Sequence, residues 1–161
     1  MSVEREQGLE ALRQTHSELV RLTSGLSDAA LDFRAAPDDW TIREILAHLV
    51  DDEKFVMRTR MERMMKEEQP VLPPHDERKW YASRNTSRDA LDQLLGDFAV
   101  QRAASLGIVE MLRESDWLRN GYQPENGEFT ADEWVGRWAK HDEVHLRQIE
   151  ARLAEYVATT G

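Results

Sequence analysis

Two histidines that could share one ligand, His141 and His145, lie four residues apart near the end of the chain. In an α-helix this spacing places both imidazoles on the same face, one turn apart. The other residues of that face are apolar or aromatic: Trp134, Val135, Trp138, Ile149 and Leu153. An imidazole on an apolar face needs a hydrogen-bond partner or a metal ion, because unpaired burial of a polar group is costly. The pair therefore predicts a metal-binding helix face, although histidines with this spacing also occur on solvated helix surfaces.

A third histidine, His48, lies in another stretch with helical periodicity, on the flank of the apolar stripe of Ile45 and Leu49. Asp52 shares that stripe, and Glu53 falls on its opposite flank. Taken alone, His48 fits a hydrogen-bonded core histidine or an interface residue better than a metal ligand. Several histidines at core-facing positions, however, indicate a site.

The remaining two histidines have different surroundings. His16 faces inward on the first helical stretch, beside Leu12 and Leu19, and is expected to be a core histidine that could also touch a substrate. His75 lies in the proline-rich segment 69–84 and is expected to be exposed.

Three neutral imidazoles suit a borderline divalent ion such as zinc or nickel. They leave at least one coordination position open for water or substrate, which distinguishes a catalytic metal site from a structural one. Asp52, Glu53 and Asp142 are candidates to orient an imidazole by accepting its other N–H. The alternative for each of these carboxylates is a solvated position at a helix edge.

Two familiar metal-binding patterns do not fit. In the HExxH pattern of metalloproteases a glutamate that acts as general base follows the first histidine, but here Asp142 follows His141. A di-iron bundle needs Glu-x-x-His on two helices, and no histidine of this chain has a glutamate three residues before it. The interpretation that remains is a mononuclear site rich in histidine.

Four helical segments are predicted to carry these residues: 3–24, 41–67, 86–114 and 130–158. Two of them begin with a capping box, Thr41 with Glu44 and Thr130 with Glu133. No convincing strand is expected, since the segment 71–74 is short and rich in proline. The predicted fold class is therefore all-α, in a single domain over residues 1–161.

The connections between these helices run to roughly 15–20 residues, which is longer than a simple up-and-down bundle needs. Such connections allow a crossover topology. Segments 69–84 and 117–129 are expected to determine specificity, with Trp80, Tyr81 and Tyr122 as candidates to line the mouth of a site. The apolar faces of the first and third helices could also support dimerisation.

Composition excludes several kinds of chemistry and partner. The chain has 161 residues and no cysteine, which excludes disulfides, thiolate metal sites and cysteine nucleophiles. Its formal net charge of −10 disfavours binding to nucleic-acid phosphates. No apolar run approaches the roughly 18 residues that cross a bilayer, and the charged N-terminal segment does not fit a signal peptide. A cytoplasmic protein without nucleic-acid or membrane partners is expected.

Two motifs carry a family resemblance. Residues 40–53, WTIREILAHLVDDE, resemble the W-S/T-x-x-E-x-L-x-H-L segment of the DinB-like superfamily. Residues 141–149, HDEVHLRQI, resemble the closing H-D-x-x-H-x-x-Q-I segment of the same group. The resemblance implies a four-helix bundle with up-down-down-up topology, often a homodimer, whose metal ligands map onto His48, His141 and His145.

The resemblance also implies an activity. Characterised members include bacillithiol S-transferases, mycothiol-dependent isomerases and other thiol-dependent transferases, so the predicted function is a metal-dependent S-transferase that acts on a small-molecule substrate. Because the chain has no cysteine, a low-molecular-weight thiol would have to be supplied as co-substrate. The residues expected nearest the substrate are His16, Trp138 and Tyr122.

Other functions stay open at this point. A metal-dependent hydrolase is a close variant of the predicted transferase. A non-catalytic bundle that binds a metal ion or a small ligand belongs to a different class, as does a structural bundle in which the histidines merely pack. Strong metal retention would exclude the structural bundle, and thiol–electrophile adduct formation that is lost in His48→Ala would separate an enzyme from a binding protein.

Overall fold

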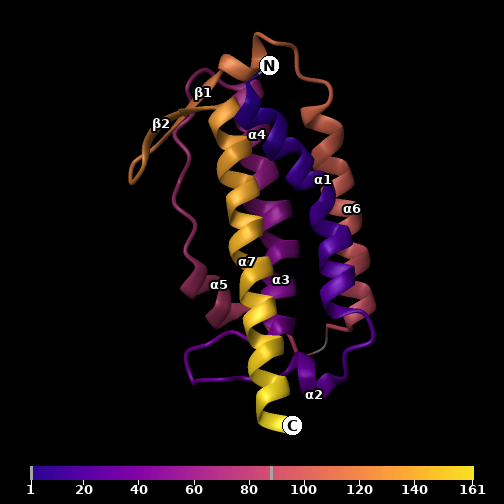
Figure 1. Cartoon of the computed structure of the whole chain (residues 1–161). Helices are drawn as coiled ribbons and strands as arrows, with labels where there is room; N and C mark the ends of the chain where they lie inside the picture. Colours follow the sequence, from indigo (N-terminus) through magenta and orange to yellow (C-terminus); the bar gives the residue numbers. More distant parts are fainter. Residues whose placement is uncertain (1, 88) are drawn as a thin grey trace.

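Four long helices lie side by side in the computed structural model, which describes residues 2–87 and 89–161 (Figure 1). The first, third and fourth are α1, α6 and α7, and the second is built from α3, a π-helical turn η1 and α4. Their bounds are α1 Val3–Thr23, α3 Ile42–Asp52, η1 Glu53–Met57, α4 Arg58–Lys66, α6 Leu91–Val109 and α7 Ala131–Thr160. In the part of the chain that the structure describes, no helix is both long and apolar enough to cross a membrane.

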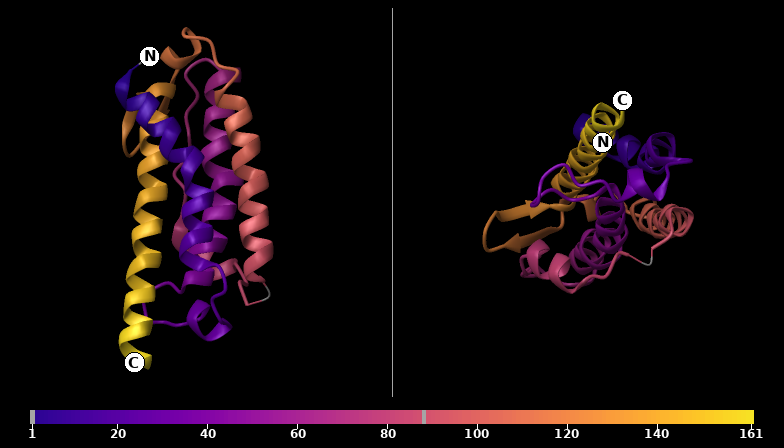
Figure 2. Two further views of the ribbon diagram at one scale, coloured as in Figure 1. Left: turned by 45° about the vertical axis from the view of Figure 1, so that its right-hand side comes forward. Right: turned by 90° about the horizontal axis from the view of Figure 1, so that it is seen from below.

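The helix directions follow the predicted topology. α1 and α7 start at one end of the bundle, whereas the α3–α4 helix and α6 both start at the other end (Figures 1 and 2). α1 packs against α7 and α6, and α3 packs against the same two helices. The predicted four-helix bundle with up-down-down-up topology is confirmed.

Two successive helices that run in the same direction require a crossover between them. After α4 ends, the chain returns along the outside of the bundle to the start of α6, and this crossover carries the short helix α5 (Glu77–Ser83) (Figure 1). Another short helix, α2 (Asp28–Leu31), follows α1. The crossover therefore lies beside α3, the helix that carries His48.

The expectation that the chain has no strand is wrong. β1 (Asn120–Gln123) and β2 (Gly127–Thr130) form an antiparallel hairpin. Tyr122 also pairs with the crossover, because its N–H donates to the Pro70 carbonyl at 2.9 Å and its own carbonyl accepts from the Leu72 N–H at 2.7 Å. The hairpin itself is local, but the crossover that also pairs with β1 is distant in sequence, and local propensity does not reveal that contact.

Both predicted capping boxes form, and each begins a helix that carries histidines of the site. The Thr41 hydroxyl accepts from the Glu44 N–H at 3.2 Å, and the Glu44 carboxylate accepts from the Thr41 N–H at 2.8 Å. Thr130 and Glu133 repeat these two bonds at the start of α7. Because each box satisfies amides that the helix itself leaves free, it fixes where the helix starts and therefore which face turns inward.

The interior consists of two apolar clusters with a polar layer between them. One cluster includes Leu12, Met61, Met64, Phe129 and Trp134. The other includes Leu19, Ile45, Leu49, Phe98 and Ile149. All four long helices contribute buried residues to the polar layer: Thr15, His48, Asp52, Glu53, Arg102, Asp142 and His145. Buried polar groups need partners, so this layer is where a functional site is expected.

Candidate metal centre

Three imidazoles converge at the polar layer, one from α3 and two from α7. The ring centroids of His145 lie 4.6 Å from those of His48 and His141, and the His48 and His141 centroids are 5.5 Å apart. One ring nitrogen from each residue lies within 4.8 Å of the others, close enough for all three to reach one ion. The two helices thus bring together the three histidines that the sequence singled out.

His48 is fully buried, and neither of its ring nitrogens makes a well-aligned hydrogen bond, although Nε2 lies 3.1 Å from Oδ2 of Asp52. Its exposed fraction is 0 %, and neither ring nitrogen makes a hydrogen bond to any residue that the structure describes. Trp40 and Trp80 pack their rings edge-on against it, with centroids at 4.9 and 5.1 Å. An imidazole held this way loses its hydration without replacement, which is unfavourable unless a ligand such as a metal ion binds it.

One ring nitrogen of His145 has a hydrogen-bond partner, and the other is available to bind a ligand. Its Nδ1 lies 2.8 Å from Oε1 of Gln148, one turn further along α7. A carbonyl oxygen can only accept, so Nδ1 carries the proton and Nε2 of the neutral ring keeps its lone pair. A partner on the other ring nitrogen is the usual way in which a metal-binding histidine is oriented.

Asp52 is the carboxylate that contacts these imidazoles. Its Oδ2 lies 3.0 Å from Nε2 of His141 and 3.1 Å from Nε2 of His48. Its Oδ1 lies 3.0 Å from Nε2 of His75. One buried carboxylate therefore lies among three histidines.

His75 is not the exposed loop residue that the sequence suggested. Its side chain is 27 % exposed, and its ring centroid lies 6.4 Å from that of His48. The crossover passes beside α3 and so brings His75 to the edge of the site. His48, Asp52 and His75 form a second set whose ligand atoms lie within 4.8 Å of one another. No local pattern around His75 identifies it, since its place depends on the path of the crossover.

Burial keeps two of the imidazoles neutral. It lowers the pKa of His48 to about 3, although the Asp52 charge opposes the shift. Burial, with a contribution from His141, likewise lowers the pKa of His145 to about 4. Both rings are neutral near pH 7, which is the protonation state that a metal ligand requires.

His141 differs because two carboxylates adjoin it. Burial lowers its pKa, but hydrogen bonding and charge from Asp142 and Asp52 outweigh this and raise the pKa to about 9. Burial raises the pKa of Asp52, but His141 and His48 shift it further in the other direction, below its ordinary value. The centre is thus an anionic carboxylate among imidazoles, an environment that favours a bound positive charge.

Glu53 and Asp142 are placed differently from Asp52. Glu53 binds the Arg102 guanidinium through both oxygens, at 2.7 and 2.9 Å, and accepts from the Trp138 indole at 2.9 Å. Asp142 lies 2.8 Å from Arg102 and accepts from the Thr15 hydroxyl at 2.6 Å. Its other oxygen is 3.7 Å from Nδ1 of His141. Asp142 therefore adjoins an imidazole, whereas Glu53 contacts Arg102 and Trp138 instead.

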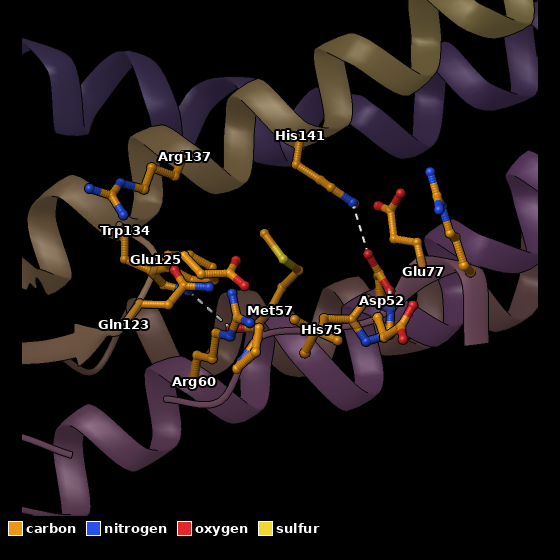
Figure 3. A pocket seen from close by; sticks show the side chains of 14 residues that line it. Asp52, Met57, Arg60, His75, Glu77, Gln123, Glu125, Trp134, Arg137 and His141 are labelled. Carbon is orange, nitrogen blue, oxygen red and sulfur yellow. Dashed lines mark hydrogen bonds and ion pairs between the residues drawn. The ribbon is translucent and has the colours of Figure 1, made fainter. Parts of the chain in front are cut away.

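A cavity of about 670 Å³ opens beside the histidines. Figure 3 shows two ends: Asp52, His75, Glu77 and His141 gather at one, and Arg60, Gln123, Trp134 and Arg137 at the other. The hairpin, the crossover, α4 and α7 all contribute to its wall. A small molecule in this cavity would reach the histidines through His141 and Asp52.

The three residues expected near a substrate lie outside the wall of this cavity. His16 is partly buried on α1, away from the other histidines. Trp138 is buried and bonded to Glu53. Tyr122 is exposed on β1, and its neighbour Gln123 lines the cavity instead. Trp80 packs against His48 from α5 and its indole donates to Asp51 at 2.8 Å, whereas Tyr81 stacks on Trp40 with ring centroids 5.6 Å apart.

The chain is thus a four-helix bundle whose polar layer brings together three histidines that could hold a metal ion. A family model described as the DinB superfamily matches residues 11–149, and the chain belongs to this superfamily.

Individual relatives support the same assignment. A protein from Oceanobacillus iheyensis that carries the name "Putative metal-dependent hydrolase OB0782" is 26 % identical over 135 residues, which cover 77 % of this chain and 71 % of the relative. YfiT from Bacillus subtilis, with the same type of name, is 20 % identical over 147 residues, covering 91 % and 82 %.

The fold also matches a solved structure. The structure of YfiT from Bacillus subtilis, described as a probable metal-dependent hydrolase with an unusual four-helix bundle topology, superposes with a TM-score of 0.84. The match covers 94 % of this chain and 87 % of YfiT at 20 % sequence identity. At that identity the likeness shows a shared fold.

Proposed function

We propose that this chain is a metal-dependent enzyme in which His48, His141 and His145 bind one divalent ion, zinc or nickel. The observation that carries the proposal is His48, which is fully buried with neither ring nitrogen hydrogen-bonded, and which faces two further imidazoles. The names of the relatives as metal-dependent proteins support it.

The donor set fits such an ion. Three imidazole nitrogens are ligands that zinc and nickel accept, and three protein ligands leave a coordination position open. Gln148 holds His145 in one orientation, and Asp52 fixes His141. The cavity adjoins His141, so the open position would be accessible to a small molecule.

The proposed reaction is transfer of a low-molecular-weight thiol to an electrophilic substrate: the sulfur bonds to the electrophilic carbon, the leaving group departs with the electron pair of the broken bond, and the thiol proton passes to solvent. A divalent ion in this position would lower the pKa of a thiol or a water molecule that reaches it. The chain contributes no cysteine, so the thiol must come from a second small molecule. Asp52 and His75 line the cavity, and Oδ1 of Asp52 lies 3.0 Å from Nε2 of His75. Because the His75 ring is partly exposed, it can pass a proton to solvent.

Hydrolysis is a second candidate, because the relatives carry names as hydrolases. The same residues serve either reaction, since water would replace the thiol as nucleophile. The polar histidine end of the cavity suits both nucleophiles equally.

The test is an activity assay on metal-loaded protein. Glutathione, bacillithiol and mycothiol are each incubated with a chromogenic alkylating electrophile, and ester hydrolysis is followed in parallel without thiol. We expect metal-dependent adduct formation with at least one thiol, lost in His48→Ala and retained in His16→Ala, which alters a histidine outside the cluster. Hydrolysis without thiol transfer would favour the second candidate. A protein that binds metal but accelerates neither reaction with these probes would contradict both.

A further inference from the structure

The arginines of this chain fall into two groups. Among those that the structure describes, all but Arg60, Arg78 and Arg137 have a carboxylate oxygen within ion-pair distance. All three exceptions line the cavity beside the histidines. In a chain with a formal net charge of −10, carboxylates are plentiful, so this grouping sets the cavity apart from the rest of the surface.

Two of these guanidinium groups lie over aromatic rings. The Arg60 guanidinium carbon lies 5.2 Å from the ring centroid of Trp134, and that of Arg137 lies 4.5 Å from the ring centroid of Phe129. Stacking of this kind holds a guanidinium in place through its face and leaves its N–H edge available. Arg60 uses one N–H on the Pro73 carbonyl, at 3.0 Å. A planar donor edge that is positioned but carries no anion is suited to bind carboxylate or phosphate oxygens.

The carboxylates of the same cavity do not neutralise these arginines. Asp52 is engaged with imidazoles at the histidine end, and Asp76 caps α5 by accepting from the Lys79 N–H at 3.0 Å. Glu77 lies 3.5 Å from Nε2 of His48. Glu125 is exposed between the two strands of the hairpin. Glu125 nevertheless lies at the arginine end, where its charge acts on Arg60 without reaching ion-pair distance (Figure 3). One exposed carboxylate against Arg60 and Arg137 leaves that end with net positive charge.

The two ends are close enough for one small molecule to reach both. Arg137 and His141 lie one turn apart on α7, which is about 6 Å along the helix axis. Figure 3 shows Arg60 and Arg137 at one end of the cavity, His141 and Asp52 at the other, and Met57 between them. A molecule held by its anionic group at the arginines would present its other end to the histidines.

We propose that the substrate or co-substrate of this site is an organic anion, whose carboxylate or phosphate group is bound by Arg60 and Arg137 while its reacting group lies at the histidines. This inference rests on the proposed function for the reacting end, but the arginine end makes a claim of its own. Arg60 and Arg137 are specificity-determining residues in this account, and they act by binding and orienting the substrate.

The test measures anion binding directly, by NMR titration of the full chain with succinate and with inorganic phosphate. We expect saturable binding that becomes at least about tenfold weaker in Arg60→Gln and in Arg137→Gln, because each variant loses a charged hydrogen-bond donor. Arg63→Gln and Arg147→Gln are matched controls, since they remove arginines of the same two helices that already pair with Glu67 and Glu143. Both controls should bind the anions as the unaltered chain does.

Further variants and zinc conditions test the anion site separately from the metal proposal. Arg137 is exposed, so its variant tests the claim even if Arg60→Gln fails to fold, and Arg137→Lys should lose less affinity than Arg137→Gln. The titrations are repeated with zinc-free protein, with zinc-loaded protein and with His145→Ala. Anion binding that persists without zinc and in His145→Ala, but is lost in Arg137→Gln, upholds the inference.

The remaining outcomes separate the two claims. If the anions bind only when zinc is present and Arg137→Gln binds them normally, the ion is their receptor and the inference is overturned, while the metal proposal stands. Absence of succinate and phosphate binding under every condition also overturns it. Arginine-dependent binding in a chain that takes up no zinc or nickel would uphold the anion site and contradict the proposed function. The relative affinity for the two probes shows whether a carboxylate or a phosphate is preferred.

Discussion

The polar layer has two parts, one around Arg102 and one around His48, which differ in how their polar atoms are satisfied. Around Arg102, every nitrogen of the guanidinium donates to an oxygen, and both oxygens of Glu53 accept. Around His48, neither ring nitrogen makes a hydrogen bond to a described residue, and the same holds for Nδ1 of His141 and Oδ1 of Asp52, although His48 and His75 each place a nitrogen within about 3 Å of the Asp52 carboxylate. The first part leaves only Oδ1 of Asp142 without a hydrogen bond, whereas the second leaves several polar atoms available to a ligand.

This difference teaches how one layer of a bundle can serve structure and function side by side. An arginine with two carboxylates makes a network of charged hydrogen bonds between helices, which fixes the position of one helix along another. The imidazoles around His48 do not close on themselves in this way, because their nitrogens face one another and a single carboxylate, and several make no hydrogen bond. Stability lost at the histidines is regained when a cation binds.

The largest effect is expected when Arg102 is removed from its network of charged hydrogen bonds. Arg102→Met would leave the Glu53 and Asp142 carboxylates buried without their cation, and the free energy of unfolding should fall by about 3–5 kcal/mol. Urea denaturation measures the change. Arg147→Met is the control, because it removes an exposed ion pair with Glu143 and should cost less than about 1 kcal/mol. Equal losses in the two variants would show that the network does not contribute as described.

Adding a metal ion should supply a partner for the imidazole nitrogens around His48 and so stabilise the folded chain. Zinc or nickel at 100 times its dissociation constant should raise the free energy of unfolding by about 2.7 kcal/mol, because the ion binds the folded chain and not the unfolded one. Thermal or urea unfolding with and without the ion measures this increase. His48→Ala should abolish it, whereas His16→Ala should keep it, and an equal increase in both variants would place the ion elsewhere.

The pH dependence of the metal-free protein should show both kinds of histidine. The folded-state pKa of His141 is raised to about 9, so its contribution to the free energy of unfolding is complete below about pH 6.5 and is lost as the pH rises through 9. The lowered values of His48 and His145, about 3 and 4, give stability that is full above about 6.5 and is lost as pH falls toward 4.

Stability should therefore be greatest near pH 6.5, with a limiting slope of about 1.4 kcal/mol per pH unit for each proton on either side. Urea unfolding of metal-free protein between pH 4.5 and 10 provides the profile. In His141→Asn the alkaline decline should shrink while the acid decline remains. A profile that stays flat from pH 6.5 to 9 in the unaltered chain would contradict the charge assigned to His141.

The smallest expected effect sharpens the comparison further. His48→Leu removes two buried nitrogens that make no hydrogen bond, so the metal-free variant should be more stable than the unaltered chain by about 1 kcal/mol. Urea denaturation of both metal-free proteins measures the difference, and the variant should no longer bind zinc. A loss of stability instead would show that the His48 ring is well satisfied as it stands.

Much of the bundle could be predicted because it depends on local signals. Apolar residues at helical spacing gave the long helices, and the capping boxes at Thr41 and Thr130 fixed where two of them start. Since a helix start and its period determine which residues face inward, the inward direction of His48, His141 and His145 followed as well.

The remainder depends on tertiary contacts. The place of His75 and the pairing of Tyr122 with Pro70 and Leu72 follow from the path of the crossover, which no local pattern encodes. The π-helical turn at Glu53–Met57 interrupts a helix that the sequence predicts to be continuous. The sequence could not distinguish the roles of Asp52 and Glu53. Only the packing of α6 shows that Glu53 pairs with Arg102, whereas Asp52 contacts the histidines.

The most direct test of the central claim is the metal content of the chain, purified without a polyhistidine tag or metal resin. Elemental mass spectrometry should find close to one zinc or nickel per chain, lost in His48→Ala and in His145→Ala but retained in His16→Ala. If the chain carries no metal and takes up neither zinc nor nickel when they are added back, the three histidines are a packing arrangement and the account is contradicted.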